Sequence, residues 1–126
     1  MDTDTFARLA RAQYEALPDE VRAMTRDIEL RVADEATPEV LAQMGIDHPD
    51  DLLGLFEGLG LSQGAVDHYT GAMPNRIWLY RLPILAFQAT GEDSLEDVVR
   101  HVLVHEIGHH FGLSDDDMYA IDDAED

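Results

Sequence analysis

The chain contains no cysteine and no lysine. Without cysteine, disulfide bridges and thiolate metal ligands are excluded, so a bound metal has to be held by His, Asp or Glu side chains. Without lysine, the 8 basic residues are all arginines, against 27 acidic residues, and the formal net charge is −19. A charge of this sign repels phosphate backbones and anionic membrane surfaces. We therefore expect neither a nucleic-acid partner nor binding to a membrane.

Long apolar runs are also lacking. No stretch approaches the roughly 20 apolar residues that cross a bilayer. The N-terminus, MDTDTFARLA, opens with acids and not with a basic segment followed by an apolar one, so we expect a cytoplasmic protein. A chain of 126 residues, 45% of them hydrophobic, is long enough for one buried core. The expectation is a single domain over residues 1–126 that is monomeric, with the acidic groups on a solvated surface.

Hydrophobic spacing predicts a mixture of helices and strands. The predicted elements are a helix over 5–17, a strand over 27–34, a helix from Thr37–Pro38 to a stop at Gly45, a short buried strand over 52–56, a surface loop over 57–75, a strand over 75–82 and a long helix from a Ser94 cap to Phe111. Pro74 and Pro83 flank the 75–82 strand, which favours a sheet edge, because proline donates no ladder hydrogen bond. Strands and helices do not alternate strictly, so the fold class is α+β.

The candidate metal-binding and catalytic residues lie on the last predicted helix. Its end and the residues after it read HVLVHEIGHHFGLSDDDM, residues 101–118. Residues four apart on a helix lie within about 40° of each other, so His105 and His109 project from one face and can bind one ion. Glu106 lies beside them. In an H-E-x-x-H zinc site the two His hold the metal and the Glu accepts a proton from the attacking water.

A third ligand is expected after the helix. Gly112 can adopt the left-handed conformation that turns the chain back, and Asp115 could then reach the metal. The whole pattern is H-E-x-x-H-x-x-G-x-x-D, with Asp116 as the next candidate ligand. Alternatively, residues 115–117 are acids at the start of a terminal helix capped by Ser114. Met118 and Tyr119 follow closely, and packing is favoured for both over a role beneath the metal or beside the oxyanion.

The remaining histidines are not placed among the ligands. His110 is rotated about 140° from His105, toward the side of the helix that packs in the core, and is interpreted as a structural residue. His101 precedes His105 by one turn and is placed beside the ligands or at the surface. His48 and His68 fall on predicted loops and are interpreted as surface residues.

These residues resemble a known family. His105, Glu106, His109, Gly112 and Asp115, with the preceding strand RIWLYR and the segment SLEDVVRHVLVHEIGHHFGLSDDDM, are similar to the small bacterial minimal zincins. The resemblance is strong from about Pro74 to Ile121 and weaker over 6–57. It implies a compact α+β domain with a small mixed sheet packed on the active-site helix. It also implies zinc held by the two His and the Asp, but no particular substrate.

The resulting hypothesis is a zinc-dependent metallopeptidase. Zinc polarises the peptide carbonyl and activates water, while Glu106 takes a proton and later passes it to the leaving amine. An extended peptide substrate is expected to pair with the edge strand over 75–82. Trp78 and Tyr80, on one face of that strand, either pack on the helix or line the cleft, and packing is favoured.

Two other functions compete with the peptidase. The first is a weak or inactive metal-binding or protein-interaction module of the same fold. Glu106 argues against it, because a structural zinc site closes with a fourth ligand and needs no base beside the water. The second is a metal-dependent RNA hydrolase, which the net charge of −19 and an Asp in place of a third His both disfavour.

Overall fold

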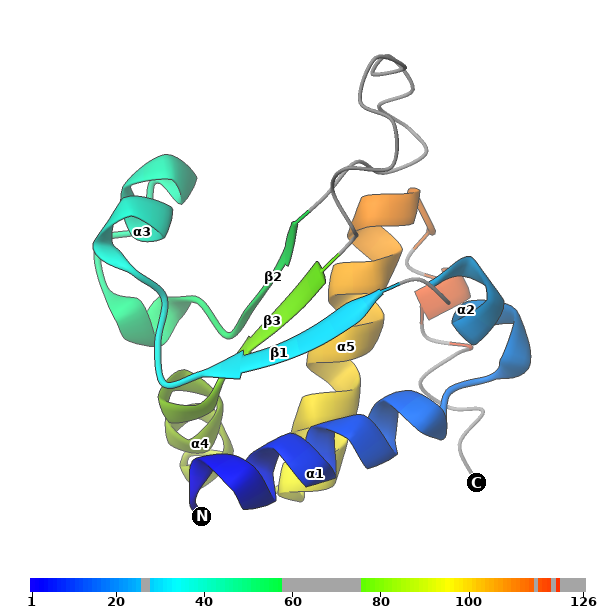
Figure 1. Ribbon diagram of the computed structural model, residues 1–126, viewed down its shortest axis with the longest axis horizontal. Helices are drawn as coiled ribbons and strands as arrows, with labels where there is room; N and C mark the ends of the chain where they lie inside the picture. Colours follow the sequence, from blue (N-terminus) through cyan, green and yellow to red (C-terminus); the bar gives the residue numbers. More distant parts are fainter. Residues whose placement is uncertain (26–27, 58–75, 115, 119, 121–126) are drawn as a thin grey trace.

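A computed structural model of the chain describes residues 1–25, 28–57, 76–114, 116–118 and 120 (Figure 1). The elements in chain order are α1 Thr3–Glu15, α2 Asp19–Met24, β1 Glu29–Ala33, α3 Pro38–Met44, the short 3-10 helix η1 Pro49–Asp51, β2 Gly54–Glu57, β3 Arg76–Tyr80, α4 Arg81–Ala89 and α5 Leu95–Phe111. Helices are mixed with strands that form one small sheet, so the α+β prediction is confirmed.

The sheet has three strands in the order β1-β3-β2. β1 runs parallel to β3, with Glu29 opposite Arg76. β2 runs antiparallel to β3, with Gly54 opposite Leu79. The sheet is therefore mixed, as the family resemblance implied, and β1 and β2 form its two edges.

The predicted edge position of the strand over 75–82 is wrong, because β3 is the central strand and pairs on both sides. The strand ends at Tyr80, and Pro83 lies in the first turn of α4. The first backbone N–H groups of a helix have no acceptor within that helix, so a proline there removes no helical hydrogen bond. Pro83 thus belongs to the start of a helix and does not restrict the pairing of β3. Neither α4 nor α2 has a counterpart among the predicted elements.

Local capping signals locate two helices well. The Thr37 hydroxyl accepts a hydrogen bond from the Val40 N–H at 3.2 Å, and α3 ends at Gly45 in the left-handed conformation, with φ 69°. The predicted helix from Ser94 to Phe111 is α5. The short strand expected over 52–56 is β2, shifted toward Glu57. The loop expected after Glu57 lies outside the described residues.

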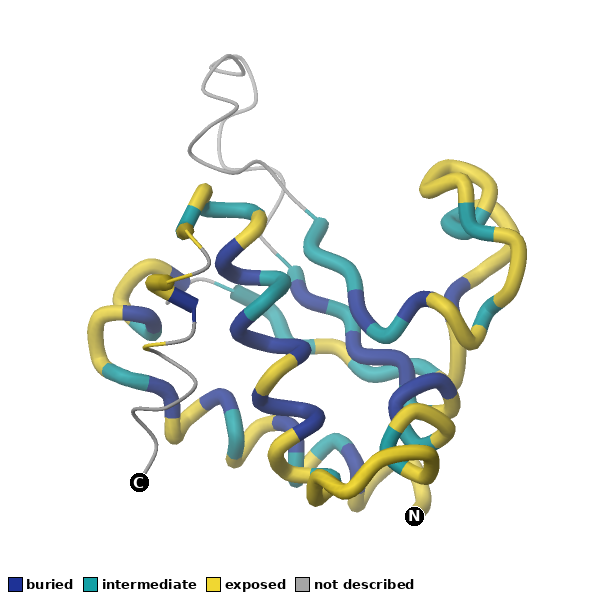
Figure 2. Tube along the Cα trace, turned by 180° about the vertical axis from the view of Figure 1, so that it is seen from behind, coloured by how far each residue is buried: buried dark blue, intermediate teal, exposed yellow. Residues whose placement is uncertain are grey.

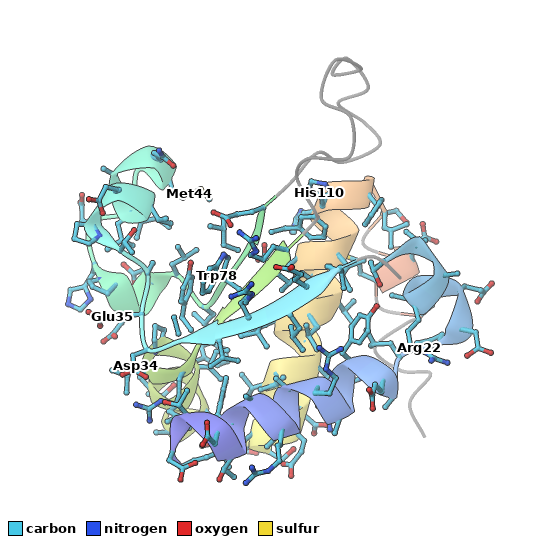
Figure 3. The ribbon with its side chains drawn as sticks, viewed as in Figure 1. Arg22, Asp34, Glu35, Met44, Trp78 and His110 are labelled. Atoms are coloured by element: carbon cyan, nitrogen blue, oxygen red, sulfur yellow. The ribbon has the colours of Figure 1, made fainter. Side chains whose placement is uncertain are left out.

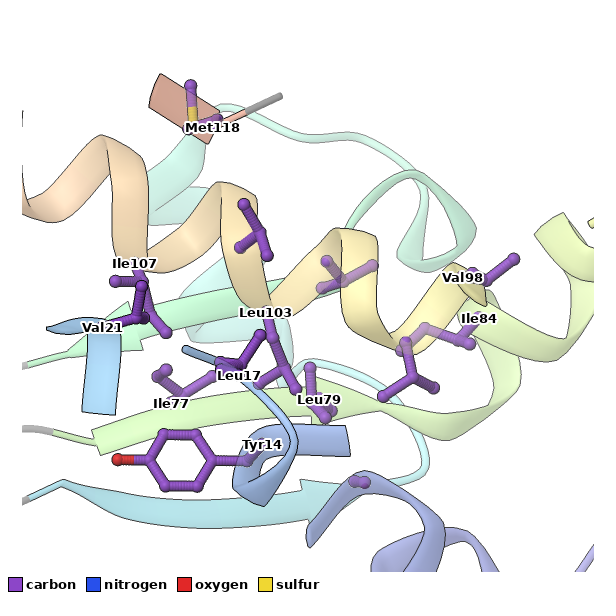
Figure 4. Close-up of a cluster of buried hydrophobic side chains, with 14 of the residues drawn as sticks. Tyr14, Leu17, Val21, Ile77, Leu79, Ile84, Val98, Leu103, Ile107 and Met118 are labelled. Carbon is purple, nitrogen blue, oxygen red and sulfur yellow. The ribbon is translucent and has the colours of Figure 1, made fainter. Parts of the chain in front are cut away.

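The core lies between the sheet and helices α1 and α5, which cover the same face (Figures 1 and 4). Figure 2 shows the buried positions recurring along one side of α5. The largest fully buried side chains are Phe6, Ile77, Leu79, Ile84, Leu103, Ile107, Val99, Val104 and Pro83. Complete burial of a large aliphatic side chain stabilises by about 1.5–3 kcal/mol, so this core fixes α5 firmly against β3. In the described parts of the chain, no helix combines the length and apolarity that crossing a bilayer requires.

Trp78 and Tyr80 lie on the opposite face of β3, because side chains alternate along a strand. Their rings are stacked with centroids 6.4 Å apart. Tyr80 is buried in a second, smaller hydrophobic cluster with Ala36 and Leu52, and Trp78 packs against that cluster (Figure 3). The Trp78 indole N–H donates to the Glu57 carboxylate at 2.8 Å. The two rings therefore pack as favoured from the sequence, but against this second cluster and not between β3 and α5.

Candidate active site

Helix α5 carries the H-E-x-x-H residues in its last turns, between two well-formed caps. The Ser94 hydroxyl accepts from the Asp97 N–H at 3.1 Å, and Glu96 and Asp97 place negative charge in the first turn. At the other end Gly112 is left-handed, with φ 73°, and the Leu113 N–H donates to the Gly108 carbonyl at 2.8 Å. The chain therefore turns back directly after the histidine pair, as the glycine predicted.

His105 and His109 lie on one side of α5, with ring centroids 5.8 Å apart. A ring nitrogen binds zinc at about 2.0–2.1 Å, which puts the metal roughly 3 Å from the ring centroid, so two imidazoles sharing one ion have centroids at most roughly 6 Å apart. The two rings are therefore close enough to share one ion. His101 is exposed and lies nearer still, 4.1 Å from His105 between centroids, so distance alone does not separate the two pairs.

The third predicted ligand, Asp115, lies outside the described residues, as does Tyr119. Over the part of the chain that the structure describes, no group of three or more His, Asp or Glu side chains could hold a metal. Asp116 is exposed. Asp117 forms a capping box with Ser114: the Asp117 N–H donates to the Ser114 hydroxyl at 3.1 Å and its carboxylate accepts from the Ser114 N–H at 3.4 Å. The predicted cap at Ser114 is therefore present, and the set of three ligands remains a prediction.

Met118 is buried and packs directly on α5 at Gly108 (Figure 4). A Cβ atom added to Gly108 would lie 2.2 Å from the Met118 sulfur and 2.6 Å from its Cγ. With a Cβ at this position the Met118 side chain would have to shift, so the glycine between the two histidines of H-E-I-G-H lets Met118 pack directly against the helix backbone. Met118 packs in the core, as the sequence favoured.

Glu106 lies half-buried between α5 and β2. The backbone N–H of Phe56 lies near its carboxyl, and its Cγ is 3.5 Å from the position that a Cβ on Gly54 would occupy. Burial raises the pKa of Glu106 to about 7, because desolvation disfavours the carboxylate, while the Phe56 N–H lowers the pKa by a smaller amount. A carboxyl that titrates near neutrality is well suited to take and return a proton.

Two further residues of α5 contact β2. A Cβ on Gly54 would lie 2.8 Å from Val102 Cγ1, so the strand approaches the helix closely only because that residue is glycine. His110 stacks on the Phe56 ring, with centroids 3.7 Å apart and planes 12° from parallel. Val102, Glu106 and His110 are spaced four apart, so they form a single stripe along the helix. A glycine inside a predicted strand was the one sequence signal for this close approach.

His110 is half-buried near the C-terminal end of α5, as predicted (Figure 3). Its Nε2 atom is buried and has no hydrogen-bond partner among the described residues. Burial lowers the pKa of His110, because desolvation disfavours the imidazolium.

Tyr80 and His48 complete the titratable residues singled out from the sequence. Burial raises the pKa of Tyr80 to about 12, and the negative charges of Glu57 and Glu106 add to that effect. His48 is exposed and accepts the Asp50 N–H at 3.2 Å through Nδ1, which caps η1 and agrees with a surface role. His68 lies outside the described residues.

A known protein family and a solved structure are similar to this chain. The family described as zincin-like metallopeptidase matches residues 25–124. A solved structure of a conserved hypothetical protein from T. thermophilus aligns with a TM-score of 0.51 and 18% sequence identity, over 86% of this chain and 92% of that one. At this identity the likeness shows a common fold alone. No curated protein matches the chain. The family match covers α5 and all three strands, and the chain belongs to the zincin-like metallopeptidase family.

Proposed function

We propose that the chain is a zinc-dependent metallopeptidase in which Glu106 is the general base and His105, His109 and Asp115 hold the metal. The observation that carries the proposal is the state of Glu106. Its carboxyl lies half-buried beside a pair of histidines four apart, and its pKa is raised to about 7. A carboxyl that served only solubility would be exposed to solvent and would have no need of this position.

The metal would supply Lewis acidity, polarising the peptide carbonyl and activating water near neutral pH. Glu106 takes a proton from the water as the water oxygen bonds to the carbonyl carbon. It then returns that proton to the amine nitrogen as the carbon–nitrogen bond breaks, which leaves a free carboxyl group and a free amine. The Phe56 N–H favours the charged form of the carboxyl, which is the form that accepts the proton.

An extended peptide is proposed to bind along β2 and not along β3, which was the candidate from the sequence. Both edges of β3 are already paired. The Tyr80 N–H donates to the Leu53 carbonyl at 3.0 Å, so alternation along an antiparallel pair turns the N–H and carbonyl of Gly54 and the carbonyl of Phe56 away from β3. The Phe56 N–H also points away from β3, but it lies at Glu106 and is not offered to the peptide. This edge also borders Glu106, so a peptide added there passes next to the base.

The proposal is tested by incubating the zinc-loaded protein with an unbiased peptide library and comparing it with Glu106→Gln at equal zinc occupancy. Cleavage by the wild type, reduced roughly 100-fold or more in the variant, is the expected result. Cleavage that is equal in both would assign the activity to another site or to a contaminant. Absence of cleavage in both, with zinc bound, would favour the metal-binding module.

A further inference from the structure

We propose that His110 is a positioning residue: by stacking on the Phe56 ring it holds the Phe56 backbone N–H at the Glu106 carboxylate. The inference deepens the proposed function, since it concerns the residue assigned there as general base. It assigns His110 no contact with substrate or metal. The juxtaposition on which it depends is visible in the structure independently of any activity.

The first support is the way β2 lies on α5. Val102 contacts the strand at Gly54, the Glu106 carboxyl lies near the Phe56 N–H, and His110 stacks on the Phe56 ring. These three residues follow one another at successive turns of the helix. Phe56 is therefore held twice, by its backbone at Glu106 and by its ring one turn farther on, and the two contacts fix its position and its rotation about the strand.

The second support is the pairing of β2. The strand is short, Gly54–Glu57, and within the described ranges it pairs on one side, with β3. The Phe56 N–H points away from β3, so the sheet's own hydrogen bonds do not align it with the carboxylate. Besides His110, the Phe56 ring has an edge-on contact with Phe111, with centroids 5.9 Å apart. The parallel stack with His110 is closer and buries the flat face of the ring.

The alternative role for His110 is a chemical one, in which a ring nitrogen binds metal or substrate. Its ring lies flat against Phe56, and it belongs to the stripe with Val102 and Glu106, whereas His101, His105 and His109 form the neighbouring stripe. A stacking role needs a flat ring and no nitrogen, while a chemical role needs the nitrogen. His110→Phe keeps the ring and removes both nitrogens, so this variant separates the two roles.

The primary experiment measures amide hydrogen exchange in the full-length, zinc-loaded protein for wild type, His110→Ala and His110→Phe. Exchange at Phe56 is compared with exchange at Leu79 and Leu103, which lie in the core. We expect His110→Ala to speed exchange at Phe56 roughly tenfold or more relative to the two core amides, and His110→Phe to stay close to wild type. Unchanged relative exchange in His110→Ala would overturn the proposal. If that variant fails to fold, Phe56→Leu, which removes the same stack from the other side, is expected to give the same acceleration.

Peptide cleavage by the same variants provides a second readout. A fall in kcat/KM in His110→Ala, with zinc content unchanged and activity restored in His110→Phe, supports the positioning role. Loss of activity or of zinc in His110→Phe would overturn the positioning role, because a ring nitrogen would then be required. Full activity in His110→Ala, in spite of faster exchange at the Phe56 amide, would overturn it as well. If no variant cleaves any peptide, the proposed function fails, and the exchange measurement alone decides the proposal for His110.

Discussion

The Glu106 carboxyl of α5 lies beside the backbone N–H of Phe56 in β2, and this N–H favours the charged form of the carboxyl. A short edge strand therefore lies next to the turn of helix that carries the histidine pair. The contact joins the two parts of the molecule that the proposed chemistry needs, the base and the strand along which a peptide can lie. It also leaves the carboxyl half-buried, and that burial governs how its charge depends on pH.

The titration of Glu106 is the first prediction. In metal-free protein the Glu106 carboxyl should titrate near pH 7, since burial disfavours its charged form. A bound cation would lower this pKa, so the acidic limb of kcat/KM in the zinc-loaded enzyme should fall at or below pH 7, with activity lost as Glu106 is protonated. Carboxyl ¹³C NMR of the metal-free protein checks the assignment. A midpoint near the ordinary value of 4.5 would contradict it.

The same burial has a cost in stability, whose sign follows from linkage. The folded-state pKa of Glu106 is raised, so between pH 4.5 and 7 the folded chain binds more protons than the unfolded chain, and wild-type stability falls as pH rises through that window. We expect Glu106→Gln to raise the free energy of unfolding of metal-free protein at pH 8 by roughly 1–3 kcal/mol, less than the full shift because the group is only half-buried.

Urea denaturation at pH 8 and at pH 4 measures this difference. At pH 4 Glu106 is protonated in both the folded and the unfolded chain, so the gain from the Gln substitution should largely disappear. A gain of the same size at both pH values would indicate that packing, and not the buried charge, is responsible.

The close approach of β2 to α5 predicts the effect of Gly54→Ala. The added Cβ would lie 2.8 Å from Val102 Cγ1 and 3.1 Å from the Trp78 carbonyl oxygen, and the backbone atom cannot swing aside. We expect a loss of roughly 1–3 kcal/mol in the free energy of unfolding, and faster exchange at the Phe56 amide as the strand moves off the helix. Gly91→Ala is the matched control, since a Cβ there meets nothing within 4 Å. Equal stability of the two variants would argue against the tight contact.

Gly108 and Met118 should behave as a coupled pair. Gly108→Ala forces the Met118 side chain away, because its sulfur lies 2.2 Å from the new Cβ, and we expect a loss of roughly 1–3 kcal/mol. In Gly108→Ala/Met118→Ala the Met118 side chain no longer occupies the space beside position 108. The double variant should therefore lose less free energy of unfolding than the sum of the losses in the two single variants. Denaturation of all four proteins completes the cycle. Strict additivity would show that the two side chains do not share this space.

Local signals in the sequence predicted the elements that depend on local interactions. Ser94 and Gly112 bound α5, and Thr37 and Gly45 bound α3, because caps and left-handed glycines act within a few residues of the chain. Pro83 led to a wrong prediction, because a proline is found both next to edge strands and in the first turn of a helix. Only the tertiary structure distinguishes the two positions. The edge position of the 75–82 strand was therefore wrong.

Of the candidate site, the sequence predicted one local relationship. The spacing of His105 and His109 implies that they share a helix face, and their rings lie close together. The contact of Phe56 with Glu106 and His110 joins segments far apart in the sequence, and no periodicity predicts which turn of α5 faces β2. Gly54 was the only local sign of it.

The zinc affinity of His109→Ala, with His101→Ala as matched control, decides whether the His105–His109 pair holds the metal. Both substitutions remove an exposed imidazole from the same side of α5, one turn on either side of His105. We expect zinc to bind the wild type and His101→Ala with similar affinity and to bind His109→Ala at least roughly tenfold more weakly. Equal affinity in the wild type and His109→Ala, or a loss confined to His101→Ala, would contradict it.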